Sequence, residues 1–339
     1  MKVLPIIIAI ALTSTIACHQ NNTSQKNRQT AELSDSLKID SLTRLINKNK
    51  RNADLYAQRS KLHIDQGHLT EAIKDLVFAN QIDSLNPEYY LHLSDFYLRM
   101  GKSEVVNSIL LKGNKLIPDN KDILYRLGNL YFYIKDYKKS IQYLNKSLEV
   151  DRYYSKAYFS KGMVYKELEN IKKATENFQF AVEREPDYYD AYIQLGLIFS
   201  EKNDSLALDY YDNALRLIPK SYEALYGKAM FYQQNKRLDE AQKTYRHILD
   251  SISIELPVIH FNTGYIDMFY YANYKNAIIH FDSALMYKPK YIEALNNKAY
   301  CYEKLGNKKR ARENYKKVLE FSPNYDLAVK GLNRLDGKN

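Results

Sequence analysis

The chain has 339 residues, of which 45% are hydrophobic and 27% charged, so it can bury a core and lacks the composition of a disordered protein. It holds only 11 glycines and 8 prolines against 32 tyrosines, and its formal net charge is +10. An all-β protein needs glycine and proline in its many tight turns, so this scarcity favours helices joined by short connections. The two cysteines exclude a disulfide framework.

Residues 1–17 have the layout of a secretory signal, with one lysine, an apolar run and then small residues. The run is too short for a permanent membrane-spanning helix. The segment Thr15-Ile16-Ala17-Cys18 resembles the bacterial lipobox, in which a small residue precedes the cysteine that is acylated and becomes the new first residue. The resemblance implies that Cys18 is lipidated, and acyl chains at about 0.8 kcal/mol per buried methylene would anchor the protein. An ordinary signal peptide with an incidental cysteine is the alternative.

Residues 18–35 follow as a polar stretch that contains no Phe, Tyr or Trp, which predicts a lipidated, flexible tether. Residue 19 is His rather than the Asp that favours inner-membrane retention of enterobacterial lipoproteins. The acidic run that marks surface-exported lipoproteins in some bacteria is also absent here. By resemblance, both features favour an outer-membrane anchor with the folded part in the periplasm.

One pattern recurs about every 34 residues, eight times over residues 53–324. Each repeat predicts two antiparallel helices, with small residues at positions 8, 20 and 27 and bulky residues at positions 11 and 24. Small residues let the helices approach closely, and large ones fill the space beside them. Proline often follows at position 32, where it ends the second helix. In the fourth repeat these residues are Gly162, Tyr165, Ala174, Phe178, Ala181 and Pro186.

This period and pattern resemble those of the tetratricopeptide repeat family, over nearly the whole chain after the signal. The resemblance implies an all-α fold, a right-handed superhelical solenoid of about eight helix-turn-helix repeats. We expect residues 36–52 to form an N-terminal capping helix and residues 325–339 a C-terminal capping helix.

Three repeats depart from the 34-residue period. The fifth is one residue short between Gly196 and Ala207. The sixth has an extra residue around Ile254-Glu255-Leu256, and the seventh has one between Gly264 and Ala277. We expect irregular packing at these places.

Enzyme signatures are absent: the sequence has no phosphate-binding loop, no zinc-protease motif, no nucleophile elbow and no CxxC. His63 and His68 are five residues apart without acidic residues arranged for metal ligation. Cys301 lies in the apolar eighth repeat, which predicts a buried structural thiol. The sequence therefore predicts a protein that is not an enzyme, with no cofactor and no metal.

A candidate binding surface follows from the resemblance, because positions 2, 5, 6, 9, 12 and 13 of the first helix line the concave groove of this family. Here those positions carry aromatic, methionine and amide side chains, whereas a solvated face is usually rich in Lys and Glu. Such a face suits an extended peptide. The alternative is that neighbouring repeats partly bury these residues. They are Tyr125, Arg126, Asn129, Tyr133, Phe159, Met163, Lys166, Ile193, Gln194, Leu197, Tyr226, Met230, Gln233, Phe261, Asn262, Tyr265, Asn296, Asn297 and Tyr300.

Two other partner classes are disfavoured. The Lys and Asn clamp of chaperone-binding relatives is missing, since Ala57 and Lys61 stand at its positions in the first repeat. Residues 288–339 hold 13 Lys and Arg against 6 Asp and Glu, an excess of +7. In a secreted lipoprotein this excess fits a solvated face or an anionic envelope partner better than nucleic acid.

Together these features predict a non-catalytic adaptor lipoprotein of the bacterial envelope, anchored by lipid and binding other envelope proteins or extended peptides. The alternative is a nutrient-capture component, for glycans or peptides, of an outer-membrane uptake system. The chain has no Trp for stacking on sugar rings and almost no portion outside the repeats, which disfavours a glycan receptor. The sequence leaves the oligomeric state open.

Overall fold

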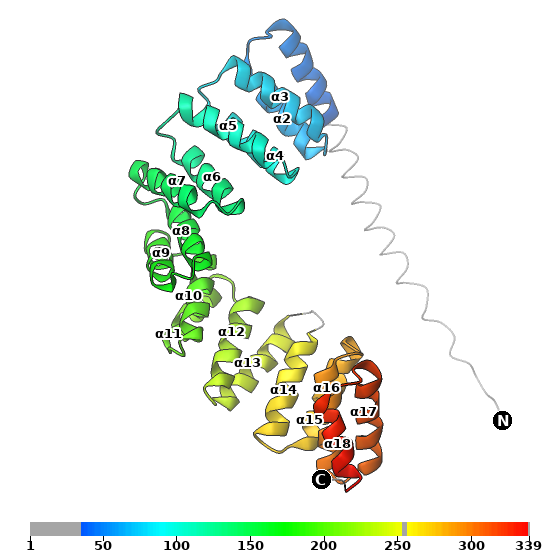
Figure 1. Cartoon of the computed structure of the whole chain (residues 1–339). Helices are drawn as coiled ribbons and strands as arrows, with labels where there is room; N and C mark the ends of the chain where they lie inside the picture. The colour runs from blue at the N-terminus through cyan, green and yellow to red at the C-terminus, as the bar shows by residue number, and fades with distance from the viewer. Residues whose placement is uncertain (1–34, 253–255, 338–339) are drawn as a thin grey trace, which may run out of the picture. The chain divides into compact units, whose positions relative to one another are not determined.

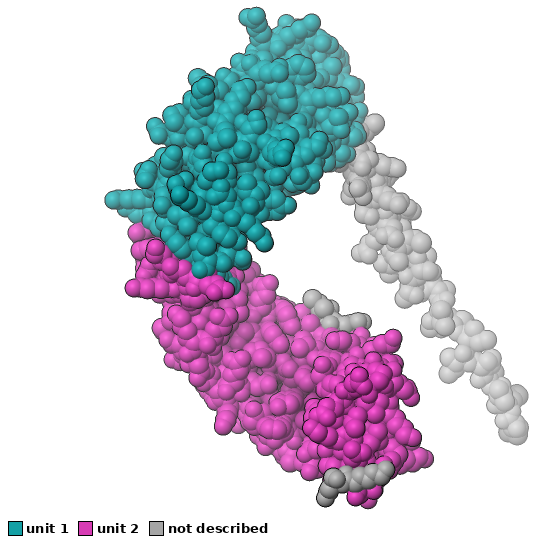
Figure 2. Space-filling view, viewed as in Figure 1, with its two compact units in different colours: residues 1–168 teal, residues 169–339 magenta. Residues whose placement is uncertain are grey.

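The computed structural model describes residues 35–252 and 256–337, in which every regular element is an α-helix (Figure 1). Cys18, the predicted signal and nearly all of the predicted tether lie outside the described residues. The chain divides into two compact units, the first ending at Leu168 and the second beginning at Glu169 (Figure 2).

The first unit contains a helix over residues 35–48 and then seven helices. These are α2 (Ala53–Asp65), α3 (Leu69–Ile82), α4 (Pro87–Arg99), α5 (Ser103–Leu116), α6 (Lys121–Tyr133), α7 (Tyr137–Val150) and α8 (Ser155–Glu167).

The second unit contains ten helices in its described residues. These are α9 (Ile171–Arg184), α10 (Tyr189–Glu201), α11 (Leu206–Leu217), α12 (Tyr222–Gln234), α13 (Leu238–Ser251), α14 (Pro257–Phe269), α15 (Tyr274–Tyr287), α16 (Ile292–Lys304), α17 (Lys308–Phe321) and α18 (Asp326–Leu335).

Within each unit, consecutive helices pack against each other, and several first helices of neighbouring repeats also touch. Thus α4 contacts α6 and α6 contacts α8 in the first unit, while α10 contacts α12 and α14 contacts α16 in the second. No repeat buries its apolar face alone, so stacking supplies the core. The predicted all-α solenoid of helix pairs is confirmed.

The core follows the predicted register. The bulky residue that each second helix carries at position 24 of the repeat is almost fully buried. Leu144, Tyr211 and Tyr315 are examples, each at 1% exposure or less. The Tyr211 ring lies so close to two glycines that a Cβ added to Gly196 or Gly227 would be 2.6 or 2.5 Å from a ring carbon. Close packing of this kind explains why position 8 of the repeat takes small residues.

The structure shows where two of the three irregular repeats differ from the others. In the fifth repeat α11 has 12 residues where the second helices of the other repeats have 14, so this helix is two residues shorter although the repeat lacks only one residue. In the seventh repeat the connection between α14 and α15 runs over residues 270–273, with Ala272 at φ 51°. Most of the segment expected to hold the extra residue of the sixth repeat lies outside the described residues.

The helices at the two ends cover the terminal repeats. In the helix over residues 35–48, Ile46 is 5% exposed and joins the core beside Tyr56. At the other end, a Cβ on Gly331 of α18 would lie 2.4 Å from the Tyr315 ring. The Arg334 guanidinium, also on α18, donates to both Glu303 oxygens at 2.8 and 2.9 Å. Burial and hydrogen bonding both tie α18 to the eighth repeat.

Candidate functional site

Seven of the predicted binding residues lie in the first unit, on α6 and α8. Tyr125 packs edge-on against Tyr154, with ring centroids 5.3 Å apart. The Arg126 guanidinium forms an ion pair with Asp95 on α4, with Nη1 2.6 Å from Oδ1. Arg126 therefore already has a carboxylate partner within the chain. Asn129, Phe159, Met163 and Lys166 are half-buried, and Tyr133, the last residue of α6, is 66% exposed.

The other predicted residues lie in the second unit, on α10, α12, α14 and α16. Leu197 on α10 is 39% exposed, whereas Ile193 on the same helix is 8% exposed. Tyr226 on α12 stacks on Tyr222, with ring centroids 5.5 Å apart and planes inclined at 15°. Gln194, Met230, Gln233, Asn297 and Tyr300 are half-buried, and Asn296 is buried.

An aromatic row lies along α14, with Tyr291 of the connection before α16 at one end. We call Tyr291, Phe261, Tyr265, Phe269 and Tyr270 the α14 aromatic row. Ring centroids are 5.0 Å apart between Tyr291 and Phe261, and 6.3 Å between Phe261 and Tyr265. The centroids of Tyr265 and Phe269 are 5.5 Å apart in nearly parallel planes, and Tyr270 stands edge-on to Phe269 at 5.1 Å. Tyr291, Phe261 and Tyr265 are half-buried, whereas Phe269 is 64% and Tyr270 38% exposed.

Asn262 lies under this surface rather than on it. It is 8% exposed, and its Nδ2 donates to the Tyr245 hydroxyl at 3.2 Å. That hydroxyl donates in turn to Gln233 Oε1 at 2.9 Å, and burial raises the pKa of Tyr245. The placement of Asn262 on an open groove was thus wrong, because neighbouring helices close over it; its amide joins α14 to α13.

Sequence reasoning missed Phe269 and Tyr270. Phe269 stands at position 13 of the seventh repeat, so the positional rule that selected Tyr133 in the third repeat would have found it. Tyr270 follows the helix, where the positional rule gives no guidance. The structure brings both rings against Tyr265.

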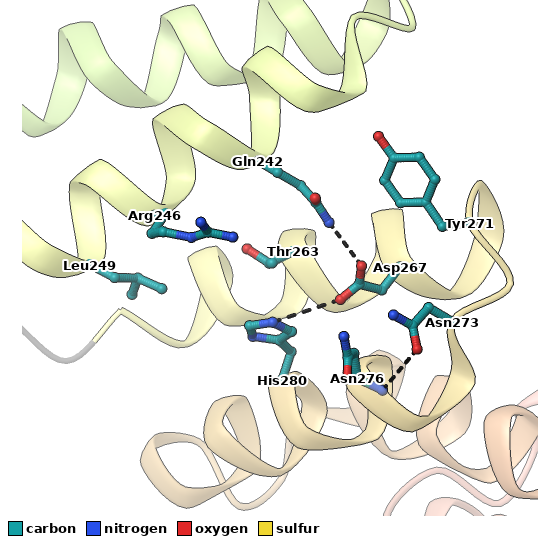
Figure 3. Close-up of a pocket in the computed structure, with 9 residues that line it drawn as sticks. All are labelled: Gln242, Arg246, Leu249, Thr263, Asp267, Tyr271, Asn273, Asn276 and His280. Atoms are coloured by element: carbon teal, nitrogen blue, oxygen red, sulfur yellow. Dashed lines mark hydrogen bonds and ion pairs between the residues drawn. The ribbon is translucent and has the colours of Figure 1, made fainter.

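A polar cavity of about 320 Å³ lies between α13, α14 and α15 (Figure 3). Asp267 of α14 is 7% exposed and accepts a hydrogen bond from Gln242 Nε2 at 2.9 Å. His280 Nε2 lies 3.7 Å from the other oxygen of Asp267. Burial lowers the pKa of His280, although the Asp267 charge opposes this shift. No sequence motif marks this cavity, because its residues come from three helices and the connection between two of them.

The described part of the chain offers few other reactive or metal-binding side chains. Cys301 is buried, which raises the pKa of its thiol to about 12. No group of three or more His, Cys, Asp or Glu side chains among the described residues could hold a metal ion. None of the described helices is long and apolar enough to cross a bilayer. The basic residues Lys308, Lys309 and Arg310 are exposed at the start of α17.

Family models of the tetratricopeptide repeat match residues 122–154, 155–188, 199–251 and 292–325. The solved C-terminal part of a tetratricopeptide repeat protein from Cytophaga hutchinsonii aligns with 71% of this chain and 98% of its own, at a TM-score of 0.63 and 18% identity. The solved pilF of Pseudomonas aeruginosa aligns with 59% of this chain and 91% of its own, at a TM-score of 0.52 and 16% identity. At these identities the likeness establishes the fold alone.

One curated relative is the uncharacterized protein ycf37 of Guillardia theta. It is 31% identical over 67 residues, which make up 20% of this chain and 38% of that protein. The match therefore spans well under two thirds of the relative's length.

Proposed function

The chain is a tetratricopeptide repeat protein, and on that premise we propose that it is a non-catalytic adaptor of the bacterial envelope that binds extended segments of other envelope proteins. The partner docks on the first-helix surface of the second unit, with the α14 aromatic row at its centre. Lipidation at Cys18 anchors the chain in the outer membrane, with the repeats in the periplasm.

The aromatic row is the observation that carries this proposal. Phe269 is 64% exposed and stacks on Tyr265, which in turn faces Phe261. Contiguous exposed aromatic rings are typical of surfaces that bind a partner, because they offer a large contact area at low cost in side-chain entropy. Exposed rings that rest on others are already ordered, so binding loses little further freedom.

The first unit supports a smaller role in binding. Its groove residue Arg126 is held by Asp95, and Tyr125 is packed against Tyr154. The Tyr154 hydroxyl donates to Asp122 at 2.7 Å, and burial together with this bond raises the pKa of Tyr154. These side chains mainly satisfy one another, so the second unit offers the better docking surface.

Site-specific photo-cross-linking in intact cells tests the docking surface. A photoreactive phenylalanine analogue replaces Phe269 in one variant and Met286 of α15, which is 67% exposed, in the control. We expect a discrete cross-linked protein from position 269 and none from position 286. Equal cross-linking at both positions, or none at 269, contradicts the proposal.

Membrane fractionation tests the anchor separately. We expect Cys18→Ser to move the protein from the outer-membrane fraction to the soluble fraction, because it removes the acylated sulfur. A serine variant that stays as membrane-bound as the unmodified chain would refute lipidation at Cys18. The cross-linking result from Phe269 does not depend on this outcome.

A further inference from the structure

The seventh repeat lacks the ring that the other repeats carry at position 11. Tyr131 stacks on Tyr143 in the third repeat, with centroids 5.4 Å apart, and Phe199 packs on Tyr210 in the fifth at 5.2 Å. The corresponding pair in the seventh repeat is Asp267 and His280, 3.7 Å apart. A carboxylate and an imidazole thus stand where these repeats have a pair of packed rings, and both line the polar cavity.

The Asp267 carboxylate is buried without a full counter-charge. Its partners are the neutral amide of Gln242 and the imidazole of His280. Burial lowers the pKa of His280, which favours its neutral form. No Lys or Arg lies within ion-pair distance of Asp267 in the part of the chain that the structure describes. Such a burial is costly, so a cationic group that enters the cavity would gain a strong interaction.

A second charged group reaches the same cavity from α13. Arg246 is exposed and lines the cavity, but forms no ion pair with any described residue. Figure 3 shows Arg246 and Asp267 extending from different helices toward the middle of the hollow. Asn273 and Asn276 add amide groups at the N-terminal end of α15. The cavity therefore presents an acceptor for a cation and a fork of donors for an anion in one small volume.

We propose that this cavity binds a free amino acid or dipeptide, with the ligand's ammonium group at Asp267 and its carboxylate at Arg246. The volume of about 320 Å³ is at the small end of the range of about 300–1,000 Å³ for ligand pockets, which suits a ligand of this size. Opposite charges on separate walls select a zwitterion over a neutral sugar. None of the residues that line this site belongs to the α14 aromatic row, and the proposal is independent of the adaptor function.

Calorimetric titration of the purified full-length protein tests the proposal. The probes are the twenty L-amino acids and a set of dipeptides, followed by the N-acetyl and the C-terminal amide forms of the best binder. We expect one or more zwitterions to bind saturably, and each blocked form to bind at least about tenfold more weakly, because each loses one charge-assisted contact.

Two variants assign the binding to this cavity. Asp267→Asn keeps the shape and removes the negative charge, and Arg246→Gln removes the guanidinium from an exposed position where unfolding is not at issue. We expect each to weaken binding at least about tenfold. The matched controls on α13 are Asp250→Asn and Lys243→Gln, which make the same charge changes on exposed residues and should leave binding unchanged.

Three results would overturn the assignment. The first is no heat of binding from any amino acid or dipeptide at millimolar concentration, as expected for a cavity that holds water alone. The second is equal binding of the N-acetyl form. The third is saturable binding of glucose or galactose with none of the zwitterions, which would make the cavity a sugar site.

Discussion

The side-chain amide of Asn262 donates a hydrogen bond to the Tyr245 hydroxyl at 3.2 Å, and so ties the first helix of the seventh repeat to the second helix of the sixth. Asn262 Nδ2 also lies 3.6 Å from Met230 Sδ, which brings α12 into the same contact. Three helices thus share one buried polar cluster. A partner cannot reach this amide, so its contribution is to stability.

Replacing Asn262 by Ala should destabilise the second unit by about 1–3 kcal/mol, because it removes a buried hydrogen bond and opens a small void. Urea unfolding followed by circular dichroism measures the loss. The control is Asn297→Ala on α16, which is half-buried and should cost much less. A larger effect of Asn262→Ala on partner binding than on stability would contradict this structural role and indicate that Asn262 contacts the partner.

Removing two rings of the α14 aromatic row should abolish partner capture without unfolding the protein. Truncation of an aromatic anchor at an interface centre costs about 2 kcal/mol or more, roughly a thirtyfold loss of affinity. We expect Tyr265→Ala with Phe269→Ala to reach this loss in quantitative pull-down of the cross-linked partner, with the helical spectrum retained. Tyr300→Ala, on the half-buried α16 position, should add to it.

Charge reversal at the basic start of α17 is the comparison for the ring variants. Reversing Lys308, Lys309 and Arg310 to Glu should weaken capture only modestly and mainly at low salt, because exposed charges act through association rate and are screened. If this reversal destroys capture and the ring variants do not, the partner docks on the basic edge instead.

Lys135 holds a backbone conformation that glycine adopts more easily. Its φ is 62°, where Gly67 and Gly101 stand at the equivalent turns with φ of 76° and 70°. A left-handed residue with a side chain costs roughly 1–2 kcal/mol, and part of this is offset by the greater chain entropy of unfolded glycine. We expect Lys135→Gly to raise the free energy of unfolding by up to about 1 kcal/mol in urea titrations. Lys138→Gly, inside α7, should lower it by about the same amount.

A methyl group added at Gly196 should destabilise the protein, because the Tyr211 ring leaves no room for it. A Cβ at Gly196 would lie 2.6 Å from the ring, so Gly196→Ala should cost on the order of 1–3 kcal/mol. Tyr211→Leu should remove much of that additional cost, and a double-mutant cycle by thermal melting would show the non-additivity. Additive effects of the two substitutions would contradict the close contact.

The fold could be read from the order of small and large residues along the chain. Gly196 and Tyr211 stand at positions 8 and 24 of their repeat, and the same contact recurs between Gly128 and Leu144 and between Gly264 and Phe281. Such contacts are local, since they join residues about half a repeat apart, so periodicity specifies them. The same rule places Phe269 on the first-helix surface.

What each surface side chain does could not be read in this way, because it depends on partners a whole repeat away. Asp95 and Arg126 are 31 residues apart, and their ion pair turns a predicted contact residue into an internal one. Asn262 is covered only because α12 and α13 approach it. The cavity at Asp267 needs Gln242 and Arg246 from the preceding repeat as well as His280. Helical periodicity gives the direction of a side chain, but the packing between repeats sets what it meets there.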